Sequence, residues 1–327
     1  MSCTPEQTWR PSASLAAIQS RAQQLSYVRD FFASRNVLEV ETPVLASHGA
    51  NDLNIDSVRV DLAPLPGFTS ARGWLQSSPE YHMKRLLAAG SGPIYQITRA
   101  FRNGERGVRH NPEFSLLEWY RPGFDDLELM AEVATLVCGW LDLQMPQRLT
   151  YRDAFCRYAG FDAVTASDSA VAQKCERWVG AELAARLTRD ECLDVLMSHE
   201  IEPALRHLPP TFLCYYPASQ AALAKTSVSE SVTVAHRFEL YVEGLELCNG
   251  YWELTDATEQ RRRFEMENRS RHAAGKPDMG IDERLLAAMA SGLPPCAGVA
   301  LGLDRLLMLK LRTRDIADVL SFPVERA

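Results

Sequence analysis

The spacing of apolar residues predicts helices in several separate parts of this chain. After Ser14, which can cap a helix, an apolar residue recurs every three or four positions until Asn36. We interpret this apolar stripe as a core or subunit contact. Similar patterns predict helices over residues 81–89, 125–143 and 256–272, from residue 282 onward, and from Arg305 toward the C-terminus. Residues 151–207 are rich in alanine and helical in pattern, which indicates an inserted helical subdomain.

Apolar runs bounded by turn residues predict strands over residues 37–45, 93–103, 113–120, 211–216, 232–242 and 245–254. The dipeptide Glu243-Gly244 between the last two predicts a hairpin. Pro43 interrupts the first strand and should lie at an edge or an interface, because a central strand needs its N–H group. Strands and helices in this order indicate an α+β fold with a mainly antiparallel sheet flanked by helices.

Composition narrows the classes of protein that remain. The chain has 327 residues, of which 46% are hydrophobic and 24% charged, so it can form one large globular domain or two small ones. A net charge of −7 argues against a broad nucleic-acid surface. The eight cysteines form no C-x-x-C pair, which favours free thiols in a reducing cytoplasm. No export signal and no long apolar run is present, so a membrane protein is not expected.

The predicted strand over residues 113–120 carries unusual chemistry. Phe114, Leu116, Glu118 and Tyr120 share one face, since alternate residues of a strand point the same way. The ring can stack on a base, and Glu118 and Tyr120 can hold an ammonium group, while Arg102 can bind a phosphate at the strand edge. A hairpin with one face in the core explains Phe114 and Leu116. It does not explain Glu118, for which the segment supplies no obvious internal partner.

The hairpin over residues 232–254 carries a second set of polar residues. Asn249, Tyr251 and Glu253 share a face, and Glu239 and Glu246 lie near the turn on opposite arms. Two converging carboxylates favour Mg²⁺ bound to phosphate, although two solvated glutamates are also common on hairpins. Glu246 and Glu253 have opposite parity, so both reach one site only if the strand has a bulge near Cys248 or Asn249.

A third motif runs from Gly298 to Arg305. Its two glycines allow the backbone to approach a flat ligand closely, and Arg305 with Arg102 would supply two phosphate-binding groups. The spacing is not that of the G-x-G-x-x-G dinucleotide motif.

Together these segments resemble the three motifs of class II aminoacyl-tRNA synthetases. Pro43 has the place of the motif 1 proline, residues 101–120 resemble motif 2, and residues 298–305 resemble motif 3. Ser78-Pro79-Glu80, Glu118-x-Tyr120 and the stretch from Glu246 to Leu254 are similar to the lysine-specific branch. Motif 1 begins too early to leave room for an anticodon-binding OB-fold ahead of it. In this the chain resembles the elongation factor P–lysine ligase family, and the whole of residues 1–327 is expected to be one catalytic domain.

The resemblance implies an enzyme that uses ATP and Mg²⁺ to activate (R)-β-lysine and transfers it to a lysine ε-amine of elongation factor P. It also implies a cytoplasmic homodimer, with neither tRNA nor a membrane as partner. One alternative is a stand-alone lysyl-tRNA synthetase-like enzyme that passes α-lysine to tRNA or another amine. Another is an inactive regulatory protein, against which the intact Arg102, Arg305, Glu239 and Glu246 argue.

The resemblance also implies roles for individual residues. Arg102 and Arg305 are the expected catalytic residues, and Glu239 and Glu246 the expected Mg²⁺ ligands. The expected ATP-binding residues are Arg102, Asn103, Gly104, Glu105, His110, Asn111, Phe114, Glu246, Leu247, Gly302 and Arg305. The expected substrate-binding residues are Ser78, Pro79, Glu80, Glu118, Tyr120, Cys248, Asn249, Tyr251 and Glu253.

Two positions depart from the family pattern. Motif 2 has glutamate two places after its arginine, whereas here Gly104 stands there and Glu105 follows, so either residue remains a candidate for the ATP contact. Cys248 replaces a glycine of lysyl-tRNA synthetases. We interpret its side chain as crowding the α-carbon of an α-amino acid, which favours a β-amino acid.

Overall fold

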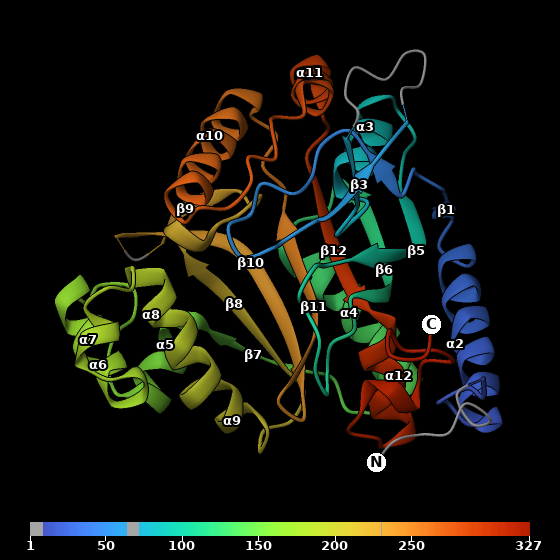
Figure 1. The fold of residues 1–327 in the computed structure, drawn as a ribbon, viewed down its shortest axis with the longest axis horizontal. Coiled ribbons are helices and arrows are strands. Elements are labelled where there is room, and N and C mark those ends of the chain that lie inside the picture. The colour runs from blue at the N-terminus through green and yellow to red at the C-terminus, as the bar shows by residue number, and fades with distance from the viewer. Residues whose placement is uncertain (1–8, 64–71, 230) are drawn as a thin grey trace. The chain divides into compact units, whose positions relative to one another are not determined.

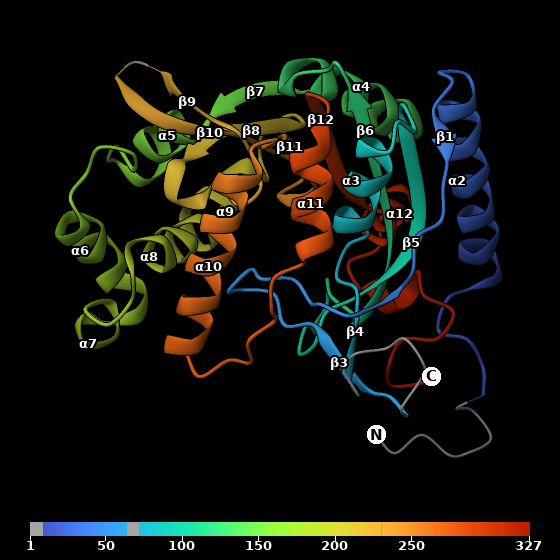
Figure 2. The same ribbon diagram turned by 90° about the horizontal axis from the view of Figure 1, so that it is seen from above.

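The computed structural model describes residues 9–63, 72–229 and 231–327, which divide into two compact units. Unit 1 takes the described residues up to Gly123, together with Thr255–Pro295 and Ala300–Ala327. Unit 2 takes Phe124–Leu254 and Cys296–Val299. Figures 1 and 2 show the elements of both units from two directions. Cys3 lies outside the described residues, and no described helix is both long enough and apolar enough to cross a membrane.

The α-helices of unit 1 are α2 (Leu15–Ala33), α3 (Glu80–Ala88), α10 (Ala257–Ala273), α11 (Glu283–Gly292) and α12 (Leu303–Leu311). Its strands are β1 (Leu38–Glu39), β2 (Leu45–Ala46), β3 (Val58–Asp61), β4 (Arg72–Leu75), β5 (Ile94–Phe101) and β6 (Glu113–Pro122). β5 pairs antiparallel with β6 and parallel with β1, whereas β2, β4 and β3 form a separate antiparallel sheet.

Aromatic packing attaches α2 to this sheet. The Phe32 ring stacks on Tyr95 of β5 at a centroid distance of 4.4 Å and meets Trp119 of β6 edge-on at 5.3 Å. Ser14 caps α2 as predicted, because its Oγ accepts a hydrogen bond from the Ala17 N–H. Toward the end of the predicted stripe Val28 and Phe32 are buried, whereas Leu25 is half-buried, Ile18 is 37% exposed and Leu15 is 71% exposed.

The predicted strand over residues 37–45 is wrong in extent. Only Leu38–Glu39 and Leu45–Ala46 are strands, and Pro43 lies between them in neither. Pro43 lacks an N–H to donate, and the Thr42 hydroxyl binds the side chain of Gln96 at 2.9 Å instead of extending a ladder. The predictions had no strand over Val58–Asp61 or Arg72–Leu75.

The α-helices of unit 2 are α4 (Asp126–Leu141), α5 (Tyr151–Ala154), α6 (Asp168–Val179), α7 (Ala181–Ala184), α8 (Arg189–Leu196) and α9 (Glu202–Leu205). Its strands are β7 (Gln147–Thr150), β8 (Thr211–Pro217), β9 (Thr226–Ser229), β10 (Val232–Val242) and β11 (Leu245–Trp252), with the first part of β12 (Cys296–Gly302). Within this unit the strand order is β12-β11-β10-β8-β7, and β9 pairs with β10. Among the pairs of this unit with a described register, only β7 and β8 run parallel.

Helices α5–α9 occupy the region predicted to be a helical insertion, beside β7 and β8 (Figure 1). Tyr151 and Phe155 stack at 4.5 Å, and Tyr151 also contacts Tyr216 of β8 at 4.8 Å, so one apolar core joins the helices to the sheet. Glu243 and Gly244 have φ of 52° and 70°, which makes the predicted tight turn of the β10–β11 hairpin. Mostly antiparallel sheets flanked by helices confirm the predicted α+β class.

Candidate active site

The predicted site residues fall in both units. Unit 1 contains Ser78, Pro79, Glu80, Arg102, Asn103, Gly104, Glu105, His110, Asn111, Phe114, Glu118, Tyr120, Gly302 and Arg305. Unit 2 contains Glu239, Glu246, Leu247, Cys248, Asn249, Tyr251 and Glu253.

Glu118 is the centre of the group in unit 1. Its carboxylate is 2% exposed and accepts two hydrogen bonds of 2.7 Å, from the Ser78 hydroxyl to Oε2 and from the Tyr120 hydroxyl to Oε1. The expectation that Glu118 has no internal partner is therefore wrong. Both partners are neutral, so they satisfy the oxygens without cancelling the charge. Burial raises the pKa of Glu118 to about 8, and the neighbouring Glu80 carboxylate adds to this rise.

Glu80 begins α3 directly after Pro79, and its backbone N–H donates to the Ser78 hydroxyl at 3.0 Å. Its Oε1 accepts a 2.6 Å hydrogen bond from the ammonium group of Lys84, one turn along the helix. Lys84 is 1% exposed. The predicted site did not include Lys84, although a glutamate followed four residues later by a lysine is a known helical ion-pair spacing.

Arg102 lies where β5 ends, at the start of the loop that leads to β6. Its guanidinium carbon is 5.1 Å from the centre of the Phe114 ring, and Nη1 is 3.8 Å from the Glu105 carboxylate. Nε of Arg102 is buried without a hydrogen-bond partner. Gly104 has a φ of 79° and turns the loop, while Glu105 points back toward Arg102. Thus an arginine and a half-buried aromatic ring lie together, as stacking on a base beside a phosphate would require.

The same loop contacts the start of α12. The Arg305 Nη2 lies 2.7 Å from the Nε2 of His110. Burial, and then the charge of Arg305, lower the pKa of His110. Asn111 is engaged differently, because its amide donates to the Glu113 carbonyl at 2.6 Å and accepts from the Val324 N–H at 3.1 Å. Asn111 therefore holds the loop and the C-terminal segment together.

Asp304 fixes the start of α12 against β6. Its Oδ2 accepts a hydrogen bond from the Ser115 backbone N–H at 2.7 Å, and its Oδ1 accepts one from the Arg21 guanidinium of α2. Asp304 is 2% exposed, so this charged contact is shielded from water. The sequence motifs assigned Asp304 no role. Because Arg305 is the next residue, the contacts of Asp304 fix the backbone position from which the Arg305 side chain extends.

In unit 2 the predicted polar side chains of Glu239, Glu246, Asn249 and Tyr251 lie on one face of the β10–β11 hairpin. Glu239 pairs with Asn249, and Arg237 with Tyr251. The register then shifts, so that Leu240 pairs with Cys248 but Tyr241 pairs with Glu246. Leu247 is thus the extra residue of a β-bulge, one position before the predicted place. The bulge brings Glu246 onto the face of Asn249 and Glu253, as its parity required.

Glu239 is closely surrounded on this face. Its Oε1 accepts a 2.5 Å bond from Arg237 and a 3.4 Å bond from the Asn249 amide, and its Oε2 accepts a 2.7 Å bond from the Tyr241 hydroxyl. Arg237 also lies over the Tyr216 ring at 4.4 Å. Arg237 was absent from the predicted site, although it stands two residues before Glu239 on the same strand.

The donor set partly fits Mg²⁺. Glu239 and Glu246 share a face, and Mg²⁺ usually takes only one or two protein carboxylates together with phosphate oxygens and water. Among the residues that the structure describes, no group of three or more histidine, cysteine or acidic side chains forms a metal site by itself. Two carboxylates do not fill the coordination shell of Mg²⁺, which phosphate oxygens and water would complete.

The other face of β11 is packed against the core. Cys248 is 2% exposed and alternates with Asn249, so its side chain lies on the side of Gly250 and Phe238. A Cβ at Gly250 would stand 2.4 Å from the Phe238 ring. Cys248 points away from Asn249. The register therefore does not support the expectation that the Cys248 side chain crowds a substrate bound on the face of Asn249.

The chain is similar to known proteins over nearly its whole length. The family described as tRNA synthetases class II (D, K and N) matches residues 7–326. The chain belongs to this class II synthetase family. Its relatives include proteins named elongation factor P–(R)-β-lysine ligase from Proteus mirabilis (48% identical), Pectobacterium carotovorum (46%) and Hamiltonella defensa (45%). Each comparison covers 98% of this chain and 98% of the relative.

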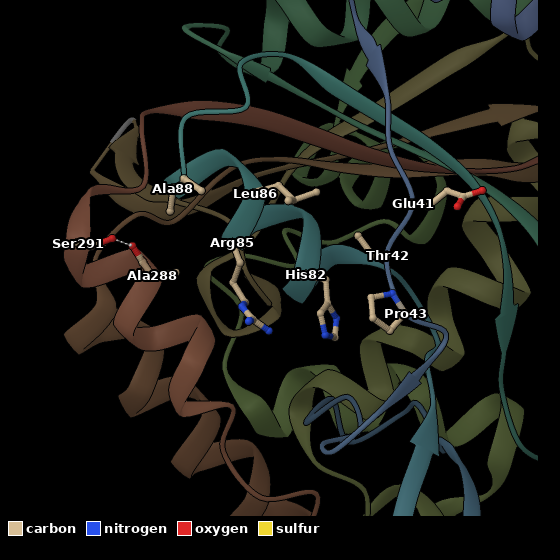
Figure 3. Close-up of a pocket in the computed structure, with 10 residues that line it drawn as sticks. Glu41, Thr42, Pro43, His82, Arg85, Leu86, Ala88, Ala288 and Ser291 are labelled. Carbon is tan, nitrogen blue, oxygen red and sulfur yellow. Dashed lines mark hydrogen bonds between the residues drawn. The ribbon is translucent and has the colours of Figure 1, made fainter. Parts of the chain in front are cut away.

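Pro43, the expected motif 1 proline, lines a cavity of about 410 Å³ in unit 1, between α3, α11 and residues 41–43 (Figure 3). His82 and Arg85 project into it from α3, beside Pro43. Within the described parts of the chain, none of the proposed nucleotide-binding or amine-binding side chains borders it. The cavity is thus separate from the group formed by Glu118 and its partners Ser78 and Tyr120. That group lies on the side of α3 that carries Glu80 and Lys84.

Proposed function

We propose that this protein joins the carboxyl group of (R)-β-lysine to ATP as an acyl-adenylate and then transfers the acyl group to a lysine ε-amine of elongation factor P. The main support is the set of relatives that carry this activity in their names and align with 98% of the chain. The buried Glu118, between two hydroxyl donors, supports a substrate with an ammonium group. The alternative, α-lysine with tRNA as acceptor, has no comparable support.

In the proposed reaction a carboxylate oxygen of β-lysine attacks the α-phosphorus, and the bond to the β-phosphate oxygen breaks to release pyrophosphate. Arg102 would bind the α-phosphate and the carboxylate, and Arg305 the γ-phosphate. Phe114 would stack on adenine, with Asn103, His110 and Gly302 near the nucleotide. Glu239 and Glu246 would hold Mg²⁺, which supplies positive charge to the phosphate oxygens when bound.

In the second step the neutral ε-amine of the acceptor attacks the acyl carbon. AMP leaves with the electrons of the broken bond, and the amine loses a proton to form the amide. No side-chain nucleophile is required, so catalysis would rest on positioning and charge stabilisation. Glu118, Tyr120 and Glu253 would hold one ammonium group of the substrate, and Glu80 and Ser78 the other.

The test is a mass-spectrometric assay with ATP, each lysine isomer, elongation factor P and bulk tRNA in separate reactions. We expect a mass increase of one lysyl group on elongation factor P, with (R)-β-lysine as the best substrate. Modification of tRNA alone would overturn the proposal. Arg102→Ala should slow ATP–pyrophosphate exchange by about 100-fold or more, since oriented charge contacts contribute on the order of 3 kcal/mol to such transition states. Glu253→Gln should raise the KM for the diamine far more than that for ATP.

We also infer a cytoplasmic homodimer. Class II synthetases with motif 1 usually dimerise. Leu38 and Leu45, on either side of Pro43, leave 56% and 37% of their surfaces exposed, and Leu15 at the start of α2 leaves 71% exposed. Sedimentation equilibrium at micromolar concentration should give twice the mass of the chain. A monomer under these conditions would contradict the inference.

A further inference from the structure

Lys84 is an unusual residue to find fully buried. Its side chain is 1% exposed, although a lysine is almost never buried unless its charge is paired. The ammonium group donates to Oε1 of Glu80 at 2.6 Å, while the Glu80 side chain remains 14% exposed. The buried ammonium group of Lys84 therefore holds one carboxylate oxygen of Glu80, whose side chain is only partly buried.

The charges of Glu80 and Lys84 both affect the ionisation of Glu118. The Ser78 hydroxyl connects the two acids, because it accepts from the Glu80 N–H and donates to Glu118. The Glu80 charge disfavours ionisation of Glu118, whereas the Lys84 charge favours it. The hydroxyls of Ser78 and of Tyr120, on its own strand, also bond to Glu118, and its partner on β5 is the neutral Gln96. Two acids and one ammonium group thus form a single electrostatic cluster.

On the basis of the proposed function, we propose that Lys84 is a positioning residue that orients the Glu80 carboxylate and cancels its charge, so that Glu118 exchanges a proton for the ammonium group of the substrate. In this exchange the neutral Glu118 carboxyl releases its proton to solvent and the resulting carboxylate pairs with the incoming R–NH₃⁺. Without Lys84, the uncompensated charge of Glu80 would oppose this ionisation more strongly. Substrate binding would then require a higher pH.

A purely structural role for Lys84 makes a different prediction. A lysine that only fills space and pairs with Glu80 would lower stability when replaced, but it would leave the pH dependence of substrate binding unchanged. The pH dependence of the KM for (R)-β-lysine distinguishes the two roles, because a packing defect does not change the pH at which Glu118 ionises.

The experiment compares three variants: Lys84→Met, Lys84→Arg and the control Arg85→Met. The control also removes one positive charge from α3. The Arg85 side chain faces the cavity of Figure 3. The KM for (R)-β-lysine is measured by ATP–pyrophosphate exchange from pH 6 to pH 9 at saturating ATP. For Lys84→Met we expect the pH midpoint of the KM profile to rise by at least half a pH unit, with a KM at pH 7 that is higher by about threefold or more and a kcat within threefold. Lys84→Arg and Arg85→Met should keep the wild-type midpoint. An unchanged midpoint in Lys84→Met would overturn the proposal.

A second measurement on the wild-type protein covers the case in which Lys84→Met does not fold. Calorimetric binding of (R)-β-lysine at pH 7, in two buffers of different ionisation enthalpy, should show release of nearly one proton for each diamine bound. Binding without proton release would contradict the exchange at Glu118. If the wild-type protein shows no exchange with any lysine isomer, the proposed function fails instead, so the two failures are distinguishable.

Discussion

Replacement of Glu118 by glutamine should make the protein more stable in alkaline solution, at the expense of its proposed activity. Glu118 is 2% exposed and next to Glu80, so its ionised form is disfavoured in the folded chain. The amide of glutamine has nearly the same shape and can contact Ser78 and Tyr120, but it cannot ionise. The substitution therefore removes the cost of a buried charge and leaves the packing unchanged.

The magnitude follows from the difference between the two pKa values. Glu118 titrates with a pKa of about 8 in the folded chain, against 4.5 for an ordinary glutamate. Between these values the folded protein retains a proton that the unfolded chain has lost, so Glu118 costs stability progressively as pH rises from about 4.5 to about 8. Between pH 6 and pH 9 the wild-type protein should lose about 3 kcal/mol relative to Glu118→Gln, at roughly 1.4 kcal/mol for each pH unit in the window.

Thermal unfolding of both proteins in a series of buffers from pH 6 to pH 9 measures this difference. The Tm of Glu118→Gln should exceed that of the wild type by an amount that grows by on the order of 5 °C across the series. The matched control is Glu113→Gln on the same strand, where the side chain is 51% exposed. The reasoning would be refuted if the Tm difference between Glu118→Gln and the wild type did not change with pH, as is expected for the control Glu113→Gln.

Other substitutions test the remaining contacts. Gly250→Ala should destabilise the fold by about 1–3 kcal/mol, because its Cβ would stand 2.4 Å from the Phe238 ring, and a double variant with Phe238→Leu should recover part of the loss in chemical denaturation. Asp304→Asn should lower Tm and slow pyrophosphate exchange, since it weakens the contacts to Ser115 and Arg21 that place Arg305, whereas the exposed Asp278→Asn should do neither. Glu246→Gln should raise the Mg²⁺ concentration at half-maximal exchange several-fold with little change in Tm, and an unchanged Mg²⁺ dependence would remove Glu246 as a ligand.

Local patterns were sufficient for much of the fold. Ser14, Asp125 and Asp256 cap helices α2, α4 and α10 at the predicted positions or one residue away, since a cap depends only on neighbouring residues. The Glu243-Gly244 turn and the shared face of Phe114, Glu118 and Tyr120 also follow from short-range geometry. The need for a bulge in β11 followed from parity alone, because two acids of opposite parity cannot otherwise face one site.

Tertiary structure decided which charges are paired. Ser78 reaches Glu118 across 40 positions, and Asp304 joins residues 189 and 283 positions away, distances at which periodicity carries no information. Burial of Lys84 likewise depends on what packs against α3, since the sequence shows only that a lysine follows Glu80 by one turn. The sequence determined where the elements begin, which face each residue takes and which family the motifs resemble. Whether an acid is buried, and which donors surround it, depends on contacts between distant segments that exist only once the chain is folded.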